Sequence, residues 1–160
     1  MNVAGASRGS FNHRFAQPSR HSSAHFDVFY PTEQFPFTDL PQTDPDTGAV
    51  GGLLDRCEAS GTTPKVFYVN SSAEYWNRSA SLIHTDVEGT ADVEPPPTVR
   101  IYHFASTQHG GADLPTGPNQ LPGNPVDFRY GHRALLVALD AWVRDGVEPP
   151  PSHHGRIADG

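Results

Sequence analysis

Two residues of the types used in acid–base catalysis each follow a short apolar run. Glu74 comes shortly after the run from Lys65 to Asn70 (KVFYVN). His109 lies in the polar turn after the run from Val99 to Phe104 (VRIYHF). Histidine exchanges a proton near neutral pH, and a carboxylate beside it fixes its tautomer and stabilises its charged form. An acid and then a histidine, each after a strand, is the order of the last two members of a Ser–acid–His triad.

Each of the two residues also has an interpretation without catalysis. Glu74 could cap or solvate a helix that begins near Tyr75, and His109 could be a loop histidine bonded to the backbone. The catalytic hypothesis makes Glu74 the acid and His109 the base, and it requires both to lie at the carboxyl ends of parallel strands, where sites in open α/β sheets are found. The residue pattern leaves both interpretations open.

The nucleophile of such a triad has one literal match, the G-x-S-x-G sequence around Ser7 (GASRG). A nucleophile elbow needs a buried strand before the serine and a helix directly after it. Only the residues from Met1 to Ala4 precede this motif, and the following SFNHRFAQP has a poor helical pattern and contains a proline. We therefore expect Ser7 not to be the nucleophile.

Composition excludes several classes of protein. The formal net charge is −7 and no basic stripe is interleaved with aromatic residues, so we expect no nucleic-acid partner. No run reaches the roughly 18 to 20 apolar residues of a membrane span, and the first residues lack the pattern of a signal peptide, so we expect no membrane association. Only 36% of the chain is hydrophobic, with 16 Pro and 15 Gly, which is little for a self-sufficient core.

Metal and thiol chemistry have weak support in the sequence. Neither H-E-x-x-H nor a Cys/His ligand spacing is present, so we expect no metal site and no cofactor. Cys57 lies in a helical-looking segment and is expected to be a small buried thiol. The other histidines weighed as ligands are His13, His25, His84, His103, His132, His153 and His154.

The elements expected to position the pair follow from apolar spacing and from Gly and Pro breaks. A short helix over 51–60 ends at Gly61, and a second short helix follows Glu74. A longer helix runs from about Phe128 to Arg144 and ends at Gly146. Its expected apolar stripe consists of Leu135, Leu136, Leu139 and Trp142.

The remaining segments are expected to lack regular structure. Residues 21–50 are predicted to form a long ordered loop, rich in aromatic residues and proline. The acidic, proline-rich stretch before Val99 is expected to be a surface excursion, and residues 147–160 a loose tail. The aromatic residues expected to hold the long loop are Phe26, Phe29, Tyr30, Phe35 and Phe37.

A β-α-β-α order predicts a parallel strand pair within a larger, doubly wound, mostly parallel sheet. Two strands do not complete such a sheet. Residues 1–146 are therefore expected to form one flank of an α/β domain that is incomplete in this chain.

Several long segments carry a family resemblance, among them KVFYVNSSAEYWNRSASLIHTD, VRIYHFASTQHG and RALLVALDAWVRDG. The chain resembles the C-terminal part of bacterial alpha/beta hydrolase domain-containing proteins over nearly its whole length. The resemblance implies an α/β-hydrolase fold with Glu74 in the acid position and His109 in the base position. It also implies that the serine elbow lies upstream of residues 1–20 and that Ser7 is not the nucleophile.

The resemblance implies an intact parent that hydrolyses a carboxylic ester or related acyl bond of a small molecule. This chain is then a C-terminal fragment without a nucleophile elbow, expected to be inactive alone, and an N-terminal fragment that complements it is a candidate partner. The alternative from another class is a non-catalytic binding or interaction fragment, or a functionless remnant of a hydrolase gene.

Overall fold

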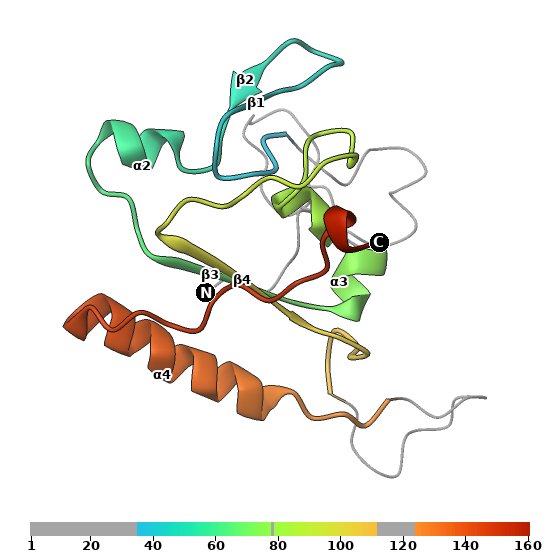
Figure 1. The fold of residues 1–160 in the computed structure, drawn as a ribbon, viewed down its shortest axis with the longest axis vertical. Helices are drawn as coiled ribbons and strands as arrows, with labels where there is room; N and C mark the ends of the chain where they lie inside the picture. Colours follow the sequence, from blue (N-terminus) through green and yellow to red (C-terminus); the bar gives the residue numbers. More distant parts are fainter. Residues whose placement is uncertain (1–34, 78, 112–123) are drawn as a thin grey trace, which may run out of the picture.

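The computed structural model describes residues 35–77, 79–111 and 124–160 (Figure 1). Its centre is a parallel pair formed by strand β3 (Val66–Ser71) and strand β4 (Val99–Phe104). Val66 is paired with Val99 at one end and Ser71 with Phe104 at the other. Both expected strands and their parallel pairing are thereby confirmed.

Side chains of the two strands alternate between two faces, and each face has its own apolar core. On one face Tyr68, Val99 and Ile101 pack with Leu54, which precedes helix α2 (Asp55–Ala59), and with Ile83 of the 3-10 helix η1 (Ala80–Ile83). Because apolar side chains point to both faces, each face of the pair needs a covering element, as in a sheet with helices on both sides.

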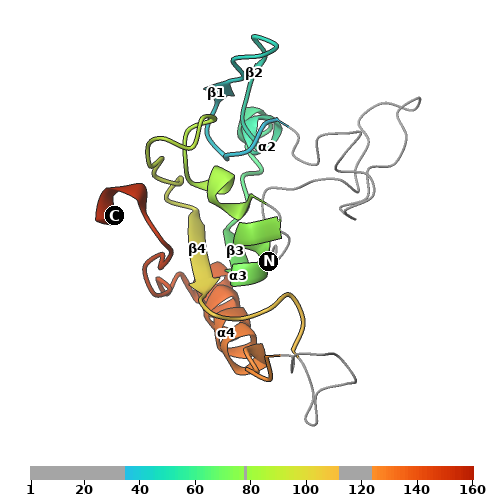
Figure 2. The same ribbon diagram turned by 90° about the vertical axis from the view of Figure 1, so that its right-hand side faces the viewer.

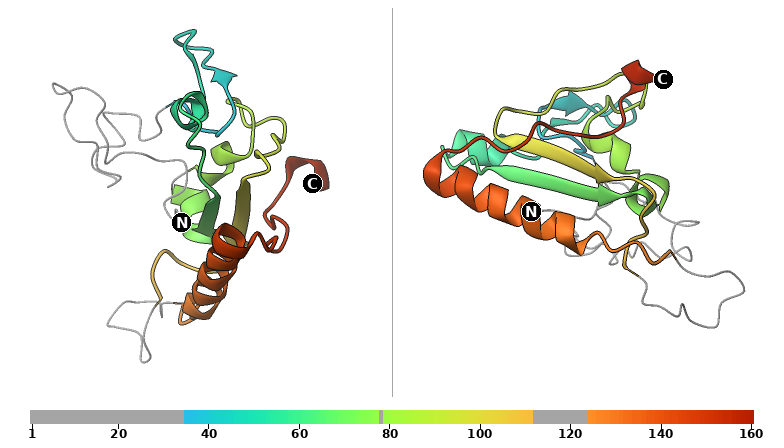
Figure 3. Two further views of the ribbon diagram at one scale, coloured as in Figure 1. Left: turned by 90° about the vertical axis from the view of Figure 1, so that its left-hand side faces the viewer. Right: turned by 60° about the horizontal axis from the view of Figure 1, so that its bottom comes forward.

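The opposite face is covered by helix α4 (Arg129–Asp145), which lies along the strands on the far side from η1 (Figure 3). Phe67, Val69 and Tyr102 pack there against Trp142, which is only 2% exposed. The rings of Phe67 and Trp142 are stacked with centroids 5.7 Å apart. Burial of these large side chains is the main attachment of α4 to the sheet.

The long helix was predicted closely, with one error in its apolar stripe. Leu135 and Leu139 are partly buried against the core, but Leu136 is 59% exposed. Successive helical residues are about 100° apart around the axis, so Leu136 points away from the face that Leu135 presents to the sheet. The expected end is confirmed, because Gly146 has a φ of 71°, which suits a glycine after a helix.

The short helices differ from the prediction at their starts. α2 begins at Asp55, later than expected, and Gly61 has a φ of 67° at the expected stop. Helix α3 (Ser72–Asn77) begins directly after β3, so Glu74 lies in its first turn and not in a loop before it.

The part of the expected long loop that the structure describes contains regular structure. Strands β1 (Gln42–Thr43) and β2 (Val50–Gly51) form a small antiparallel hairpin. Phe35 and Phe37 contact each other edge to face, with ring centroids 5.9 Å apart. Phe26, Phe29 and Tyr30 lie outside the described residues.

The C-terminal residues are not the loose tail that the sequence suggested. After α4 the chain turns back and runs beside β4, on the side away from β3 (Figure 2). The amide of His153 donates to the carbonyl of Ile101, and the amide of His103 donates to the carbonyl of His153, both at 2.8 Å. The Tyr102 hydroxyl donates to the Pro150 carbonyl at 2.7 Å. The tail is ordered because it pairs with backbone groups on the outer edge of β4.

Candidate active site

The structure brings Glu74 and His109 into direct contact at the carboxyl ends of β3 and β4. His109 Nδ1 lies 2.5 Å from Glu74 Oε1. The two residues are distant in sequence, and each is placed by the segment that follows one strand of the parallel pair. The Glu74 side chain is 4% exposed, whereas the His109 side chain is 74% exposed. A buried carboxylate therefore holds one nitrogen of a ring whose remainder faces solvent.

The second oxygen of Glu74 caps the start of its own helix. Oε2 accepts from the Ser71 amide at 2.6 Å and from the Ser71 hydroxyl. The Ser71 hydroxyl oxygen in turn accepts from the Ala73 amide at 3.2 Å. This S-x-x-E arrangement is a capping box. The capping interpretation and the contact with His109 are both realised, one on each carboxylate oxygen.

The turn that carries His109 is braced on both sides. The Ser106 amide donates to the Ser72 hydroxyl at 2.8 Å, which ties the turn to α3. The Thr107 hydroxyl donates to the Phe104 carbonyl, and the Gln108 side chain donates to the Asn124 carbonyl at 3.1 Å. These bonds fix the path of the chain from the end of β4 to His109.

The environment keeps the Glu74 carboxyl ionised. Burial by itself acts to raise its pKa, but hydrogen bonds from Ser71 and His109 outweigh that effect, and the pKa of Glu74 is lowered from its ordinary value. A buried, charged carboxylate on Nδ1 favours the tautomer in which Nδ1 carries the proton and Nε2 has a free lone pair. That tautomer can accept a proton at Nε2, which is what a general base does.

A cavity of about 140 Å³ lies beside the pair. Aromatic side chains of β4 and of the region where α4 begins contribute to its lining. Its lining residues are Val69, Ser71, Glu74, Phe104, His109, Phe128 and His132. Sequence reasoning identified Glu74 and His109 but missed the others. The S-x-x-E spacing from Ser71 was the one signal that could have revealed a further member.

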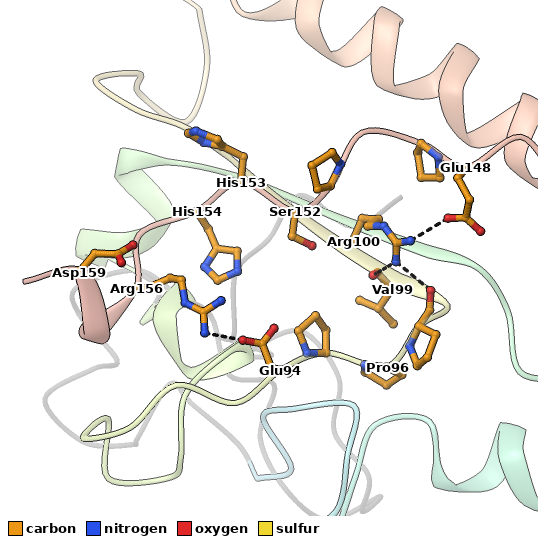
Figure 4. Close-up of a pocket in the computed structure, with 14 residues that line it drawn as sticks. Glu94, Pro96, Val99, Arg100, Glu148, Ser152, His153, His154, Arg156 and Asp159 are labelled. Atoms are coloured by element: carbon orange, nitrogen blue, oxygen red, sulfur yellow. Dashed lines mark hydrogen bonds and ion pairs between the residues drawn. The ribbon is translucent and has the colours of Figure 1, made fainter.

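A larger cavity, of about 690 Å³, lies elsewhere, between the proline-rich segment before β4 and the tail (Figure 4). Neither Glu74 nor His109 lines it. Arg100 is bound to Glu148 at 2.8 Å, and Arg156 is bound to Glu94 (Figure 4). Its two arginines are therefore already paired with carboxylates, and the arrangement joins the tail to the sheet.

Other histidines cluster with Tyr75, the residue after Glu74. The Tyr75 hydroxyl is 2.9 Å from His84 Nε2, and its ring lies 4.3 Å from that of His103 between centroids. The rings of His84 and His154 are 4.2 Å apart, which places the tail over this cluster. We call Tyr75, His84, His103 and His154 the histidine stack.

Burial disfavours charge on Tyr75, His84 and His103 of the histidine stack. It lowers the pKa of His84 to about 4 and raises the pKa of Tyr75 to about 12. The pKa of His103 is also lowered, first by burial and then by the neighbouring His154 and His153. His84 and His103 are therefore neutral near pH 7 and pack as rings.

The remaining sequence candidates are placed as follows. Ser7, His13 and His25 lie outside the described residues. Cys57 lies in α2 and is partly buried against the core. Within the described ranges no group of three or more His, Cys, Asp or Glu side chains is arranged to hold a metal ion. In the same part of the chain, no helix has the length and apolar character needed to cross a membrane.

Comparison with known families identifies the fold. A family model described as an alpha/beta hydrolase domain matches residues 4–160, which is nearly the whole chain. The chain belongs to this alpha/beta hydrolase domain family. Neither a search of curated proteins nor a search of solved structures gave a match.

Family membership and the structure agree on the fold class. The alpha/beta hydrolase domain match and the small parallel sheet with helices on both faces confirm the expected α/β architecture. The resemblance drawn from the sequence is correct at the level of the family.

Proposed function

We propose that this chain is the C-terminal section of a serine α/β-hydrolase, with Glu74 as the acid and His109 as the base of a Ser–acid–His triad. The observation that carries the proposal is the 2.5 Å contact between Glu74 Oε1 and His109 Nδ1, with the rest of the His109 ring open to solvent. A histidine held only for structure has no need of an exposed Nε2 and a buried, ionised partner.

The proposed substrate is a small-molecule carboxylic ester or related acyl compound. His109 Nε2 takes the proton of a serine hydroxyl as that oxygen attacks the carbonyl carbon. The tetrahedral intermediate collapses to an acyl-enzyme, and His109 returns the proton to the departing alcohol. Water then attacks the acyl-enzyme, with His109 again accepting the proton. The second tetrahedral intermediate collapses with cleavage of the acyl–serine bond, His109 returns the proton to the serine oxygen, and the carboxylic acid is released. Glu74 stays ionised and stabilises the imidazolium in both halves of the reaction.

The serine is proposed to come from another segment of the parent protein. Within the residues that the structure describes, no serine or cysteine side chain is hydrogen-bonded to His109. Among the described residues β3 pairs with β4 alone, whereas parallel strands normally belong to larger sheets with both faces covered. We infer that further parallel strands of the parent protein, with the serine elbow, lie beside β3 on the side away from β4.

This arrangement makes a complementing N-terminal fragment the proposed partner. The chain alone is expected to lack turnover, because a triad without its nucleophile and the following oxyanion-hole amide cannot form an acyl-enzyme. The reading frame upstream of Met1 gives a first check. A strand, a G-x-S-x-G motif and a helix encoded there support the proposal, whereas an upstream promoter and start site favour a non-catalytic fragment.

The direct test compares two substitutions in the complete parent, assayed with short-chain nitrophenyl esters. His109→Ala should abolish nearly all turnover, whereas Ser7→Ala should leave it largely intact. Unchanged turnover in the histidine variant would refute the assignment.

A second experiment treats the 160-residue chain alone with a serine-directed phosphonate. We expect neither ester turnover nor a specific label. Labelling at Ser7 together with turnover would show that the literal motif is the nucleophile after all.

A further inference from the structure

Three aromatic side chains that the proposed triad does not itself require line the cavity beside Glu74, whose side chain is 4% exposed. We define the aromatic wall as Phe104 of β4, Phe128 just before α4, and His132 of α4, all of which line the cavity beside Glu74 and His109. The His132 ring meets Phe104 edge to face at 5.3 Å and Phe128 at 5.0 Å between centroids. Phe104 and Phe128 are stacked at 6.2 Å.

Close approach of α4 to β4 holds the wall together. A Cβ atom built on Gly131 would lie 2.4 Å from Phe104 Cε1 and 2.5 Å from its Cζ. Any side chain at Gly131 would therefore displace the Phe104 ring. The glycine next to His132 thus lets the helix sit against the ring that His132 contacts.

His132 is suited to the wall because it is neutral near pH 7. Burial lowers its pKa, and the nearby Glu74 charge acts in the opposite direction with a smaller effect. Other charges near the start of α4 are already engaged, since Arg129 binds Asp127 and Arg133 lies over the Tyr130 ring. A neutral His132 leaves the Glu74 carboxylate to His109.

We propose that His132 is a positioning residue for the Glu74–His109 pair, acting through the aromatic wall. The wall limits the access of water to the Glu74 carboxylate. Glu74 Oε1 therefore keeps its hydrogen bond to the proton on His109 Nδ1. Hydrogen bonds to charged groups are stronger where water is excluded. The catalytic consequence rests on the function proposed above, whereas the effect on the hydrogen bond does not.

The test measures exchange of the His109 Nδ1 proton with water by NMR in ¹⁵N-histidine-labelled protein. His132→Phe preserves the wall and should leave the exchange rate near that of the unmodified protein. His132→Ala opens the wall and should accelerate exchange at least about tenfold. Leu136→Ala, on the exposed side of the same helix, is the matched control and should have no effect.

Equal exchange rates in His132→Ala and the unmodified protein would overturn the proposal. Faster exchange in His132→Phe would also overturn it, because the wall would then not be the relevant feature. Phe128→Ala opens the same wall from another element and provides a second decisive comparison if His132→Ala does not fold. In the complete parent, kcat should fall in His132→Ala and recover in His132→Phe with KM unchanged. A parent whose turnover survives His109→Ala refutes the triad but leaves the exchange result valid.

Discussion

Two consecutive residues of α3, Glu74 and Tyr75, contact histidines that differ in exposure and in the charge their surroundings favour. Glu74 binds His109 through a carboxylate whose pKa is lowered, and the histidine is mostly exposed. Tyr75 belongs to the histidine stack, where burial lowers the pKa of His84 to about 4 and raises that of Tyr75 to about 12. The Glu74 carboxylate is held ionised, whereas burial disfavours charge on Tyr75 and His84.

The contrast identifies which histidine is suited to chemistry. A general base needs a free nitrogen that can reach a substrate and a partner that stabilises its protonated form. His109 has both. His84 is 2% exposed and, within the described part of the chain, its Nδ1 has no hydrogen-bond partner. The histidine stack therefore attaches the tail, and a cluster of histidines is not by itself a site.

The largest expected effect is a difference in kcat between a variant of Glu74 and a variant of Tyr75. Glu74→Gln keeps the shape of the side chain but removes its charge, and a corresponding change in a serine protease triad lowers kcat about 10⁴-fold. We expect a fall of about 10³- to 10⁴-fold in kcat of the complete parent. Tyr75→Phe is the matched control on the other side and should change kcat less than about threefold. Similar losses in both variants would remove the distinction.

The next effect concerns the pH dependence of stability. The folded protein holds His84 neutral, with a pKa of about 4 against an ordinary 6.5, so the unfolded chain binds the proton first as the pH falls. His84 should therefore stabilise the fold fully above pH 6.5, and on the order of 3 kcal/mol should be lost by pH 4. Denaturant unfolding of the complete protein at a series of pH values measures this loss.

The control for that measurement is a variant on the other side of α3. His84→Gln should reduce the slope of the stability profile between pH 6.5 and 4, and the slope that remains comes from His103 and His132, whose pKa values are also lowered by burial. Glu74→Gln should not change the stability profile in that pH window. The pKa of Glu74 is lowered in the folded protein, so the stability it contributes is lost only below its ordinary pKa of 4.5, and the variant should differ only at that lower pH. An unchanged slope in His84→Gln would show that His84 is not held neutral in the folded protein.

A smaller effect tests the packing of the aromatic wall. Gly131→Ala forces Phe104 to move, because the new methyl would lie 2.4 Å from its ring. Overpacking of this kind costs about 1 to 3 kcal/mol, measurable as a lower midpoint of thermal unfolding. Gly155→Ala, in the tail, meets no atom within 4 Å and should leave the midpoint nearly unchanged. Equal midpoints in the two variants would contradict the close approach of α4 to β4.

The smallest expected effect lies at the tail. Glu148 accepts from Arg100 at 2.8 Å, but its side chain is 68% exposed. Removing the charge by Glu148→Gln should cost less than about 1 kcal/mol. A loss of several kcal/mol in denaturant unfolding would mean that the ion pair, and not the histidine stack with the β4 pairing, attaches the tail.

Local patterns in the sequence predicted the elements whose signals lie within a few residues. Short apolar runs were sufficient to predict β3 and β4, and helical apolar spacing was sufficient to predict α4, although Leu136 was wrongly included in its stripe. The pairing of Glu74 with His109 followed from the position of each after a strand. The aromatic wall and the histidine stack were missed because each joins residues from several distant segments.

The order of the tail was also missed by sequence-based prediction, because it depends on contacts with a distant segment. Its prolines and charged residues resemble a disordered end, and nothing local indicates the edge of β4. Pairing of His153 with Ile101 and His103 depends on where α4 returns the chain. Long-range placement, and not local propensity, decides whether such a segment is ordered.

A double-mutant cycle tests the central claim, that Glu74 and His109 act as one unit. The cycle compares kcat/KM of the complete parent with Glu74→Gln, His109→Ala and both changes, using one ester. We predict that the double variant is no less active than His109→Ala alone, because the acid has no role once the base is gone. Losses that multiply, or a Glu74→Gln variant with unmodified activity, would contradict the account.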